Sequence, residues 1–589
     1  MSLEKETKMK RSHCHSGIWG RTLLMVCALL LSASLAFAQE RKMSKDLDGK
    51  NPSDQVDVIV QFTHAPTAKH HKKVVDRGGK FKQEHALIKG GSYSLPASAL
   101  ADLAADPDVA YISADRSVTS TGSADTNAVL DYYLPTLNAQ YATSLGYDGT
   151  GIGVAVIDSG ISDIPDLHAQ NYRVVYAQDF TGKSTVDEYA HGTHVAGIIG
   201  GGGKNSTGSN YFYTIKGIAP NVSLINLKVL DKNGAGTDSS VVSAIQAAIN
   251  LKSTYNIRVI NLSLGRPVYE SAALDPLCQA VENAWKAGIV VVVAAGNEGR
   301  NNSQNTSGYG TITAPGNDPY VITVGAMKTM GTSSRADDPI ASYSSKGPTL
   351  YDHVVKPDLV APGNRIISLY KAGLTLPKQF PGNEIPTSLY QTNGNTTASS
   401  TYYRLSGTSM AAPMVSGTAA LLLQQNPNLT PDQVKARLMK SASKNIQSYS
   451  TATDPATGLV FTSQSDIFTV GAGYLDIQAA LSNADLATAT AGSALSPTVA
   501  RDASGNTVLV SGSSVIWGGS VAWGTSLVWG TGVVWGTNVS GQSILWGSGG
   551  VWGTNTMEGY SVLWGTGVVW GTSSTPTGEA TAVAINGEN

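Results

Sequence analysis

The chain has 589 residues, which at about 150 residues per domain predicts around four units, tails included. Hydrophobic residues make up 41% of the chain and mean hydropathy is −0.06, so a large core is expected and a membrane-like composition is excluded. The formal net charge is −2. This balance lacks the positive excess by which proteins bind phosphate backbones, so we expect no nucleic-acid partner.

Residues 1–38 have the pattern of a secretory signal. A basic start is followed by an apolar run and by the small-x-small cleavage site Ala36-Phe37-Ala38. The run is shorter than the roughly 20 residues that a membrane-spanning helix needs. The pattern predicts a secreted or extracellular protein; association with the cell surface and an uncleaved N-terminal anchor stay open as alternatives. Cys278 is then the lone cysteine of the mature chain, and we expect it to be buried and structural.

The first folded unit is predicted after a polar linker at residues 39–54. Residues 55–116 alternate between strand and helix patterns, from QVDVIVQF to VAYISAD, and this β-α-β-α-β order indicates a small α+β domain. Residues 117–129 are rich in Ser, Thr and Gly, which is typical of a linker open to processing.

The main domain is predicted at residues 130–482. Near-continuous apolar runs, typical of strands buried on both faces, alternate there with helical patterns; they lie at 151–158, 222–230, 257–265, 288–297 and 320–327. This alternation predicts an α/β fold, with a doubly wound, mostly parallel sheet.

The last part of the chain changes composition. A linker at 483–510 precedes residues 511–573, where a Trp-Gly hexapeptide of the form V-x-W-G-T-x recurs, and residues 574–589 are predicted to be disordered. The even spacing of most of these tryptophans would place them on one side of an extended chain, so we expect a β-rich repeat tail. Two interpretations stay open: the rings pack on one another, or they bind a surface or polymer.

Candidate catalytic residues stand where such a sheet carries its functional groups. Asp158 and Asn297 each end an apolar run, and the carboxyl ends of parallel strands share one edge of the sheet. His191 begins the segment HGTHVAGIIG, and Ser409 stands at the start of a helical run in LSGTSMAAPMVSG. The sequence therefore predicts that an acid, an imidazole and a hydroxyl converge.

These residue types suit nucleophilic acyl transfer. A serine hydroxyl is a weak nucleophile until a base takes its proton, and imidazole is a base near neutral pH. A buried carboxylate fixes the imidazole, while the Asn297 amide and the Ser409 backbone N–H can bind the developing oxyanion. The spacing of His191 and His194 lacks the acid of a zinc motif, so we expect His194 to pack or to bond locally.

Together with VIDSGI, NLSLG, AAGNEG, YSSKGP, KPDLVAPG and GAGYLD, these motifs make about 350 residues of the chain resemble the subtilisin-like serine peptidases, or subtilases. The resemblance implies an endopeptidase that acts on proteins or peptides without a catalytic cofactor. It implies that Asp158 is the orienting acid, His191 the general base, Ser409 the nucleophile and Asn297 the oxyanion donor.

Further roles follow from the same resemblance. Ser263, Leu264 and Gly265, and likewise Ala294, Ala295 and Gly296, match the strands that hold an extended substrate. Residues 55–116 match the inhibitory propeptide, which implies that the chain is a precursor carrying its own intramolecular inhibitor. The family often holds structural Ca²⁺, and Asp166 matches a common ligand while the loop 200–210 does not match, so calcium stays open.

Two hypotheses concern departures from compact relatives. A long stretch between Gly363 and Gly407 precedes the nucleophile motif, and we expect it either to cover the rim of the cleft or to lie on a remote surface. The alternative to an active enzyme is an exported binding protein with a vestigial peptidase domain and an adhesive tail.

Overall fold

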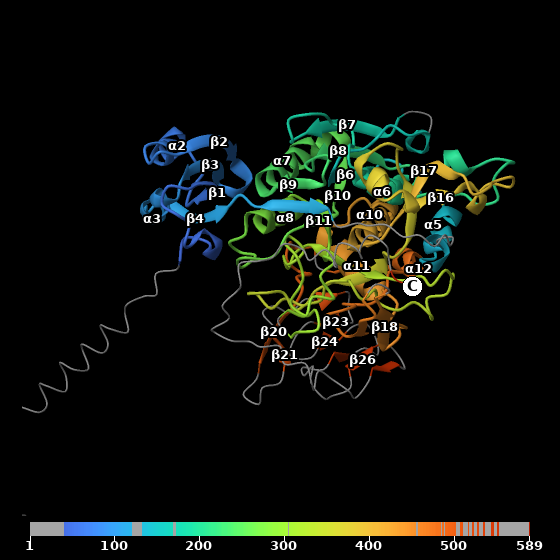
Figure 1. The fold of residues 1–589 in the computed structure, drawn as a ribbon. Helices are drawn as coiled ribbons and strands as arrows, with labels where there is room; N and C mark the ends of the chain where they lie inside the picture. The colour runs from blue at the N-terminus through green and yellow to red at the C-terminus, as the bar shows by residue number, and fades with distance from the viewer. Residues whose placement is uncertain are drawn as a thin grey trace, which may run out of the picture.

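The computed structural model describes residues 41–120, 132–168, 172–303, 305–454, 457–484, 486–487, 489–501 and 507–510, six short strands between 516 and 552, and Glu588. A small N-terminal domain lies beside a larger α/β domain, and one extended segment connects the two (Figure 1). The signal sequence predicted at 1–38 lies outside the described residues. No helix among the described residues is long and apolar enough to cross a bilayer.

The N-terminal domain is a four-stranded sheet with two helices. The sheet has the order β2-β3-β1-β4, and both neighbours of β1 run antiparallel to it. Its elements are β1 (Gln55–Phe62), α2 (Ala68–Val75), β2 (Lys80–His85), β3 (Gly90–Pro96), α3 (Leu100–Ala104) and β4 (Val109–Ala114). Leu47, from the stretch predicted as a linker, is buried in the same core as Val58 and Ile112.

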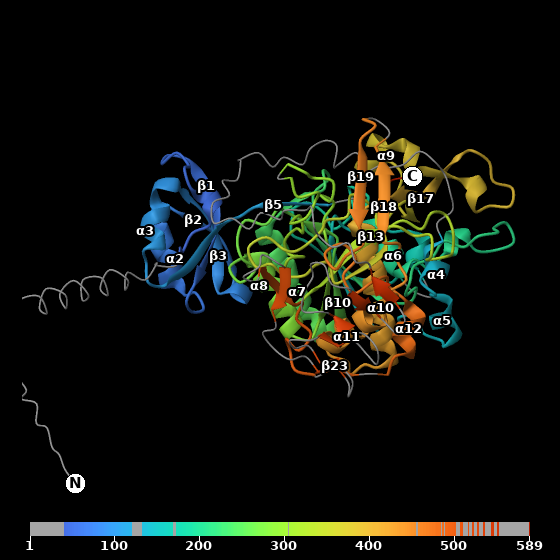
Figure 2. The same ribbon diagram turned by 90° about the horizontal axis from the view of Figure 1, so that it is seen from below.

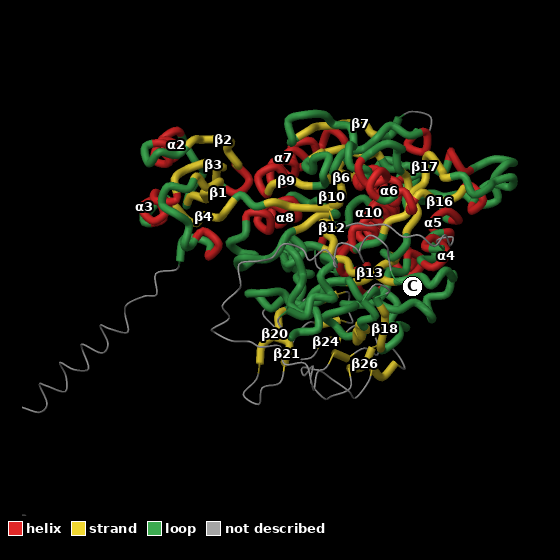
Figure 3. Tube along the Cα trace, in the orientation of Figure 1, coloured by secondary structure: helices red, strands yellow, loops and turns green. Residues whose placement is uncertain are grey.

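The larger domain is built on a seven-stranded sheet in which every pair of neighbours is parallel, in the order β14-β13-β12-β10-β6-β8-β7. The strands are β6 (Gly153–Asp158), β7 (Val174–Asp179), β8 (Ser223–Lys228), β10 (Ile257–Leu262), β12 (Val290–Ala294), β13 (Ile322–Met327) and β14 (Leu359–Pro362). The predicted mostly parallel sheet is confirmed, and its apolar runs are buried because helices cover both faces (Figure 3).

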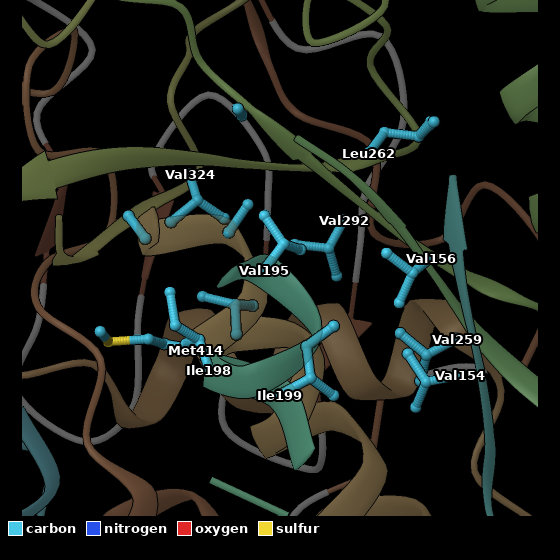
Figure 4. Close-up of a cluster of buried hydrophobic side chains, with 14 of the residues drawn as sticks. Val154, Val156, Val195, Ile198, Ile199, Val259, Leu262, Val292, Val324 and Met414 are labelled. Atoms are coloured by element: carbon cyan, nitrogen blue, oxygen red, sulfur yellow. The ribbon is translucent and has the colours of Figure 1, made fainter. Parts of the chain in front are cut away.

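Two pairs of long helices lie on opposite sides of this sheet (Figure 1): α6 (His191–Gly200) with α10 (Thr408–Gln425), and α7 (Asp238–Tyr255) with α8 (Pro276–Lys286). Val195, Ile198 and Met414 from the first pair pack toward the valines of the sheet strands (Figure 4). The other helices of this domain are α4 (Tyr133–Thr136), α5 (Gln140–Ser144), α9 (Thr375–Gln379), α11 (Pro431–Ser441) and α12 (Ile477–Ser482). This packing fixes the first turns of α6 and α10 near the carboxyl ends of the strands.

A third sheet connects the two domains. The segment that leaves the N-terminal domain forms β5 (Ser117–Ser120), which inserts between β11 (Leu264–Gly265) and β9 (Ala235–Thr237) and is antiparallel to both. Figure 2 shows β5 reaching from the small domain into the large one. Along β5, Val118 is buried, while Ser117 and Thr119 are exposed.

The long insertion before α10 is folded. It contributes to a sheet of β15 (Ile366–Leu369), β17 (Ala398–Leu405) and β16 (Glu384–Pro386). The backbone N–H groups of Thr375 and Leu376 donate to the carbonyls of Glu188 and Tyr189, three and two residues before His191. The insertion thus lies against the segment that leads into α6, and its proposed effect on substrates stays a prediction.

The remaining strands are short. They are β18 (Tyr449–Thr453), β19 (Val460–Gln464), β20 (Thr498–Arg501) and β21 (Thr507–Val510), followed by β22 (Ile516–Trp517), β23 (Val521–Ala522), β24 (Leu527–Val528), β25 (Val534–Trp535), β26 (Ile544–Trp546) and β27 (Gly550–Trp552). The described parts of the repeat tail pair as antiparallel strands, for example Trp517 with Val521 and Trp552 with Ile544.

Candidate active site

A buried acid–imidazole pair forms the centre of the site. Asp158 ends β6, and His191 is the first residue of α6. The His191 Nδ1 atom lies 2.8 Å from Asp158 Oδ1, and both side chains are almost fully buried. His191 Nε2 makes no hydrogen bond in the structure. With Nδ1 held by the carboxylate, Nε2 is the nitrogen available to accept a proton from a nucleophile.

The start of α6 depends on Asp187, a residue that the sequence analysis did not single out. One of its carboxylate oxygens accepts the backbone N–H of Ala190 at 2.8 Å, and the other accepts the N–H of Thr193 at 2.9 Å. The hydroxyl of Ser159, next to Asp158, also donates to Asp187 at 2.9 Å. Burial raises the pKa of Asp187. An acid shortly before a predicted helix start is the signal that could have identified this cap.

Ser409 lies in the first turn of α10, where backbone N–H groups point out of the helix. Its hydroxyl donates to the carbonyl of Ser263 at 2.9 Å, and the Ser263 hydroxyl donates to the carbonyl of Ser409 at 2.9 Å. Behind this pair, Ser416 donates to Asn261, whose amide donates to the Ser263 hydroxyl. Hydrogen bonds therefore hold the carboxyl end of β10 and the residue that follows it against the start of α10.

Asn297 is oriented from the same helix start. Its Oδ1 atom accepts hydrogen bonds from both the backbone N–H and the hydroxyl of Thr408, each at 3.0 Å. The Thr408 hydroxyl also accepts the N–H of Gly296 at 3.1 Å. These contacts of Oδ1 fix the orientation of the Asn297 side chain, whose amide nitrogen is a donor group.

The two predicted substrate strands behave differently. Leu264 and Gly265 form β11 and pair with Ser120 and Thr119 of β5. Ala294 instead ends β12, and Ala295 and Gly296 follow the strand; the Ala295 carbonyl accepts the N–H of Thr313. The second partner of β5 is β9 (Ala235–Thr237), which the sequence analysis missed. Its short AGT sequence carries no strand pattern, and glycines on both sides of Ala235 are the one available hint.

Two nearby side chains are inert. His194 Nε2 lies 3.1 Å from the carbonyls of Ile366 and Tyr403, and burial lowers the pKa of this imidazole to about 3, so it stays neutral. Cys278 is buried and its thiol donates to Asn317, while burial raises its pKa well above the ordinary value. Neither group is suited to metal or thiolate chemistry at neutral pH.

The surroundings of Asp166 do not fit a calcium ion. One carboxylate oxygen accepts the backbone N–H of Asn205 at 2.6 Å, and the other accepts the hydroxyl of Tyr402 at 2.8 Å. Calcium requires six to eight oxygen ligands, whereas donor hydrogens point at this carboxylate. Within the described part of the chain, no group of three or more His, Cys, Asp and Glu could hold a metal.

Comparison with known proteins places this geometry in a family. The Peptidase_S8 model, described as the subtilase family, matches residues 149–466, from just before β6 to just beyond β19. The chain belongs to the subtilases. It is a subtilisin-like serine endopeptidase, a hydrolase whose family needs no cofactor for catalysis.

Individual subtilases cover different shares of the chain. Subtilisin E of Bacillus subtilis is 32% identical over 425 residues, which is 71% of this chain and 92% of that protein. Serine protease AprX of the same species is 40% identical over 307 residues, 50% of this chain and 62% of its own length. The crystal structure of fervidolysin from Fervidobacterium pennivorans, a keratinolytic enzyme related to subtilisin, aligns with a TM-score of 0.54. That alignment covers 80% of this chain and 66% of fervidolysin at 22% identity, and it supports the fold alone.

Proposed function

We propose that this subtilase is an exported endopeptidase that hydrolyses peptide bonds through an acyl-enzyme on Ser409. The observation that carries the proposal is the buried hydrogen bond between Asp158 and His191, which leaves Nε2 to act as a base. In this mechanism His191 takes the Ser409 proton as Oγ attacks the carbonyl, and then returns it to the leaving amine. A water then repeats the sequence and releases the acid.

The charge that develops on the carbonyl oxygen needs donors that are already in place. The Asn297 amide, oriented by Thr408, and the backbone N–H of Ser409 in the first turn of α10 supply two. Both donors belong to segments fastened by hydrogen bonds, so little reorganisation is required when the charge appears.

We also propose that residues 55–116 are an inhibitory propeptide and that β5 blocks the substrate channel. β5 has two strand neighbours in the large domain, as an extended substrate would. Ser120 pairs with Leu264, the residue after Ser263, whose carbonyl accepts the Ser409 hydroxyl. This register supports cleavage shortly after Ser120, within the linker predicted at 117–129.

Export itself and the attachment of the tail to a surface or polymer stay predictions from the sequence. Residues 1–40 and most of the repeat tail lie outside the described residues.

The test is to express the wild-type chain and Ser409→Ala, and to measure peptide hydrolysis, intact mass and the N-terminal sequence. We expect hydrolysis to fall by about 10⁶-fold in the variant, because the nucleophile is lost. The wild type should begin within the linker at 117–129, shortly after Ser120, and the variant should keep its N-terminal domain. Ser482→Ala, an exposed serine on α12, is the control and should behave as wild type. Hydrolysis by Ser409→Ala at the wild-type rate would contradict the mechanism, and cleavage of both chains at one site would show that another protease matures the precursor.

A further inference from the structure

A polar pocket in the large domain encloses the side chain of Glu588. This residue is only 5% exposed, although it falls in the segment 574–589 that the sequence predicts as disordered. Its carboxylate accepts a hydrogen bond from Arg300 Nη2 at 3.0 Å and lies 3.3 Å from Lys328 Nζ. The backbone N–H of Ser342 donates to it at 3.1 Å, and the Ser342 hydroxyl donates as well.

The pocket also binds the main chain of its occupant. The N–H of Glu588 donates to Asn364 Oδ1 at 2.9 Å, and Asn364 Nδ2 donates to the carbonyl of Glu588 at 3.0 Å. The amide side chain of Asn364 thus hydrogen-bonds to both the N–H and the carbonyl of the same residue. A free carboxylate ion could not make these two contacts, so the chemistry fits a glutamate within a peptide.

The charges of the pocket walls favour an acidic occupant. Arg300 and Lys328 are 7% and 3% exposed at the side chain. Arg300 also pairs with Asp454 at 3.1 Å and lies over the ring of Phe461. Glu588 brings a second carboxylate to these two buried cations, and buried charges are stable only when they are paired and hydrogen-bonded.

The pocket borders the catalytic centre. Lys328 follows β13, Asn364 follows β14, and Arg300 comes three residues after Asn297, so all three extend from the edge of the sheet that carries the site. Gly363, next to Asn364, accepts a hydrogen bond from the N–H of Gly407, two residues before Ser409.

We propose that Arg300, Lys328, Ser342 and Asn364 form a peptide-binding subsite that selects glutamate, and that Glu588 fills it in cis. An acidic residue of a substrate or of a separate peptide then competes with Glu588 for the same contacts. The role of the subsite in substrate choice rests on the proposed peptidase function, whereas the binding does not require hydrolysis.

The experiment measures binding in chains that cannot cleave. A labelled peptide with the sequence of residues 581–589 is titrated by fluorescence anisotropy against full-length Ser409→Ala and against full-length Ser409→Ala/Glu588→Ala. A tethered ligand acts at an effective concentration on the order of mM, so retained Glu588 should weaken peptide binding by at least about tenfold. In the Ser409→Ala/Glu588→Ala chain, here called the open chain, the subsite is not filled by Glu588. Replacing the glutamate of the peptide by glutamine should weaken binding to the open chain by about tenfold or more, because charge-assisted hydrogen bonds are lost.

The controls separate this proposal from the peptidase mechanism. Lys328→Met in the open chain should lower peptide affinity, whereas Lys286→Met, on the outer part of α8, should leave it unchanged. Equal binding to both chains, equal binding of the Glu and Gln peptides, or no binding at 1 mM peptide, on the order of the tether concentration, would each overturn the proposal. The Gln comparison uses one and the same protein, so it decides the matter even if Lys328→Met fails to fold.

Discussion

Two segments from outside the peptidase domain lie near the active edge of its sheet, and they are held in opposite ways. β5 is held through its backbone, as the middle strand between β11 and β9. Glu588 is held through its side chain and by one asparagine that contacts its main chain. Strand pairing accepts many sequences, whereas a pocket with buried cations accepts one kind of residue.

The ion pairs at the two places have reversed polarity. Next to β5, Arg116 of the incoming segment binds Glu270 of the peptidase domain at 2.7 Å and Asp46 at 2.8 Å. At the other place the incoming residue is the carboxylate of Glu588, and the arginine, Arg300, belongs to the peptidase domain. The two contacts therefore use opposite charges on the incoming segment, and each contact can be broken separately.

Among the substitutions that test this comparison, Arg116→Met is expected to have the largest effect on the free energy of opening β5. Glu270 is only 3% exposed at its side chain, and removing its partner leaves a buried charge unpaired. We expect the free energy of opening β5 to fall by about 3–5 kcal/mol. Hydrogen exchange of the β5 amides in full-length Ser409→Ala measures this value.

A matched control is Arg77→Met. Arg77 pairs with Asp102, whose side chain is 71% exposed, and lies 3.8 Å from Asp106, which Lys73 also binds, so its loss should cost less than about 1 kcal/mol. If both variants changed the exchange of β5 equally, the special role of the Arg116–Glu270 pair would be refuted.

The next effect is a pH dependence of the contact between the N-terminal domain and the peptidase domain. His85 lines a cavity of about 410 Å³ between the N-terminal domain and α7, and burial lowers its pKa to about 4 from the ordinary 6.5, against the opposing effect of Glu84. His85 therefore binds a proton less readily when the N-terminal domain is docked on the peptidase domain than when the two domains are separated. Docking is unaffected above pH 6.5 and weakens as the pH falls toward 4, by roughly 30-fold at pH 5.

Hydrogen exchange of β5 between pH 7 and pH 5, corrected for intrinsic exchange rates, measures this effect. His85→Leu should flatten the profile, and His64→Gln, an exposed histidine of the same domain, should not. A profile with the same slope in His85→Leu would assign the pH dependence to other groups.

The parts of the fold that could be predicted from the sequence are those fixed by local pattern. The apolar runs ending at Asp158 and before Asn297 predicted strands buried on both faces, and a parallel sheet gathers their carboxyl ends at one edge. His191 and Ser409 were found because each begins a helix within a distinctive motif.

The parts that were missed depend on tertiary contacts. β9 has the sequence Ala-Gly-Thr and becomes a strand because β5 lies beside it. The contacts of Glu588 join it to residues more than 200 positions away, and nothing in its local sequence indicates a partner. Asp187 lies between these cases, since an acid before a helix start is a local signal that a closer inspection would have used.

The smallest effect is expected at Val118, a buried residue of β5. If strand pairing alone held this segment, its side chains would contribute little. Val118→Ala removes apolar surface from the core without changing the backbone bonds, so we expect the free energy of opening β5 to fall by about 1–2 kcal/mol. Thr119→Ala, at the adjacent exposed position, should change it by less than about 0.5 kcal/mol. Hydrogen exchange of β5 in the Ser409→Ala chain compares the two. Equal effects would mean that β5 is bound by its backbone alone, and a larger effect at Val118 would show that this strand, like Glu588, is also recognised through a side chain.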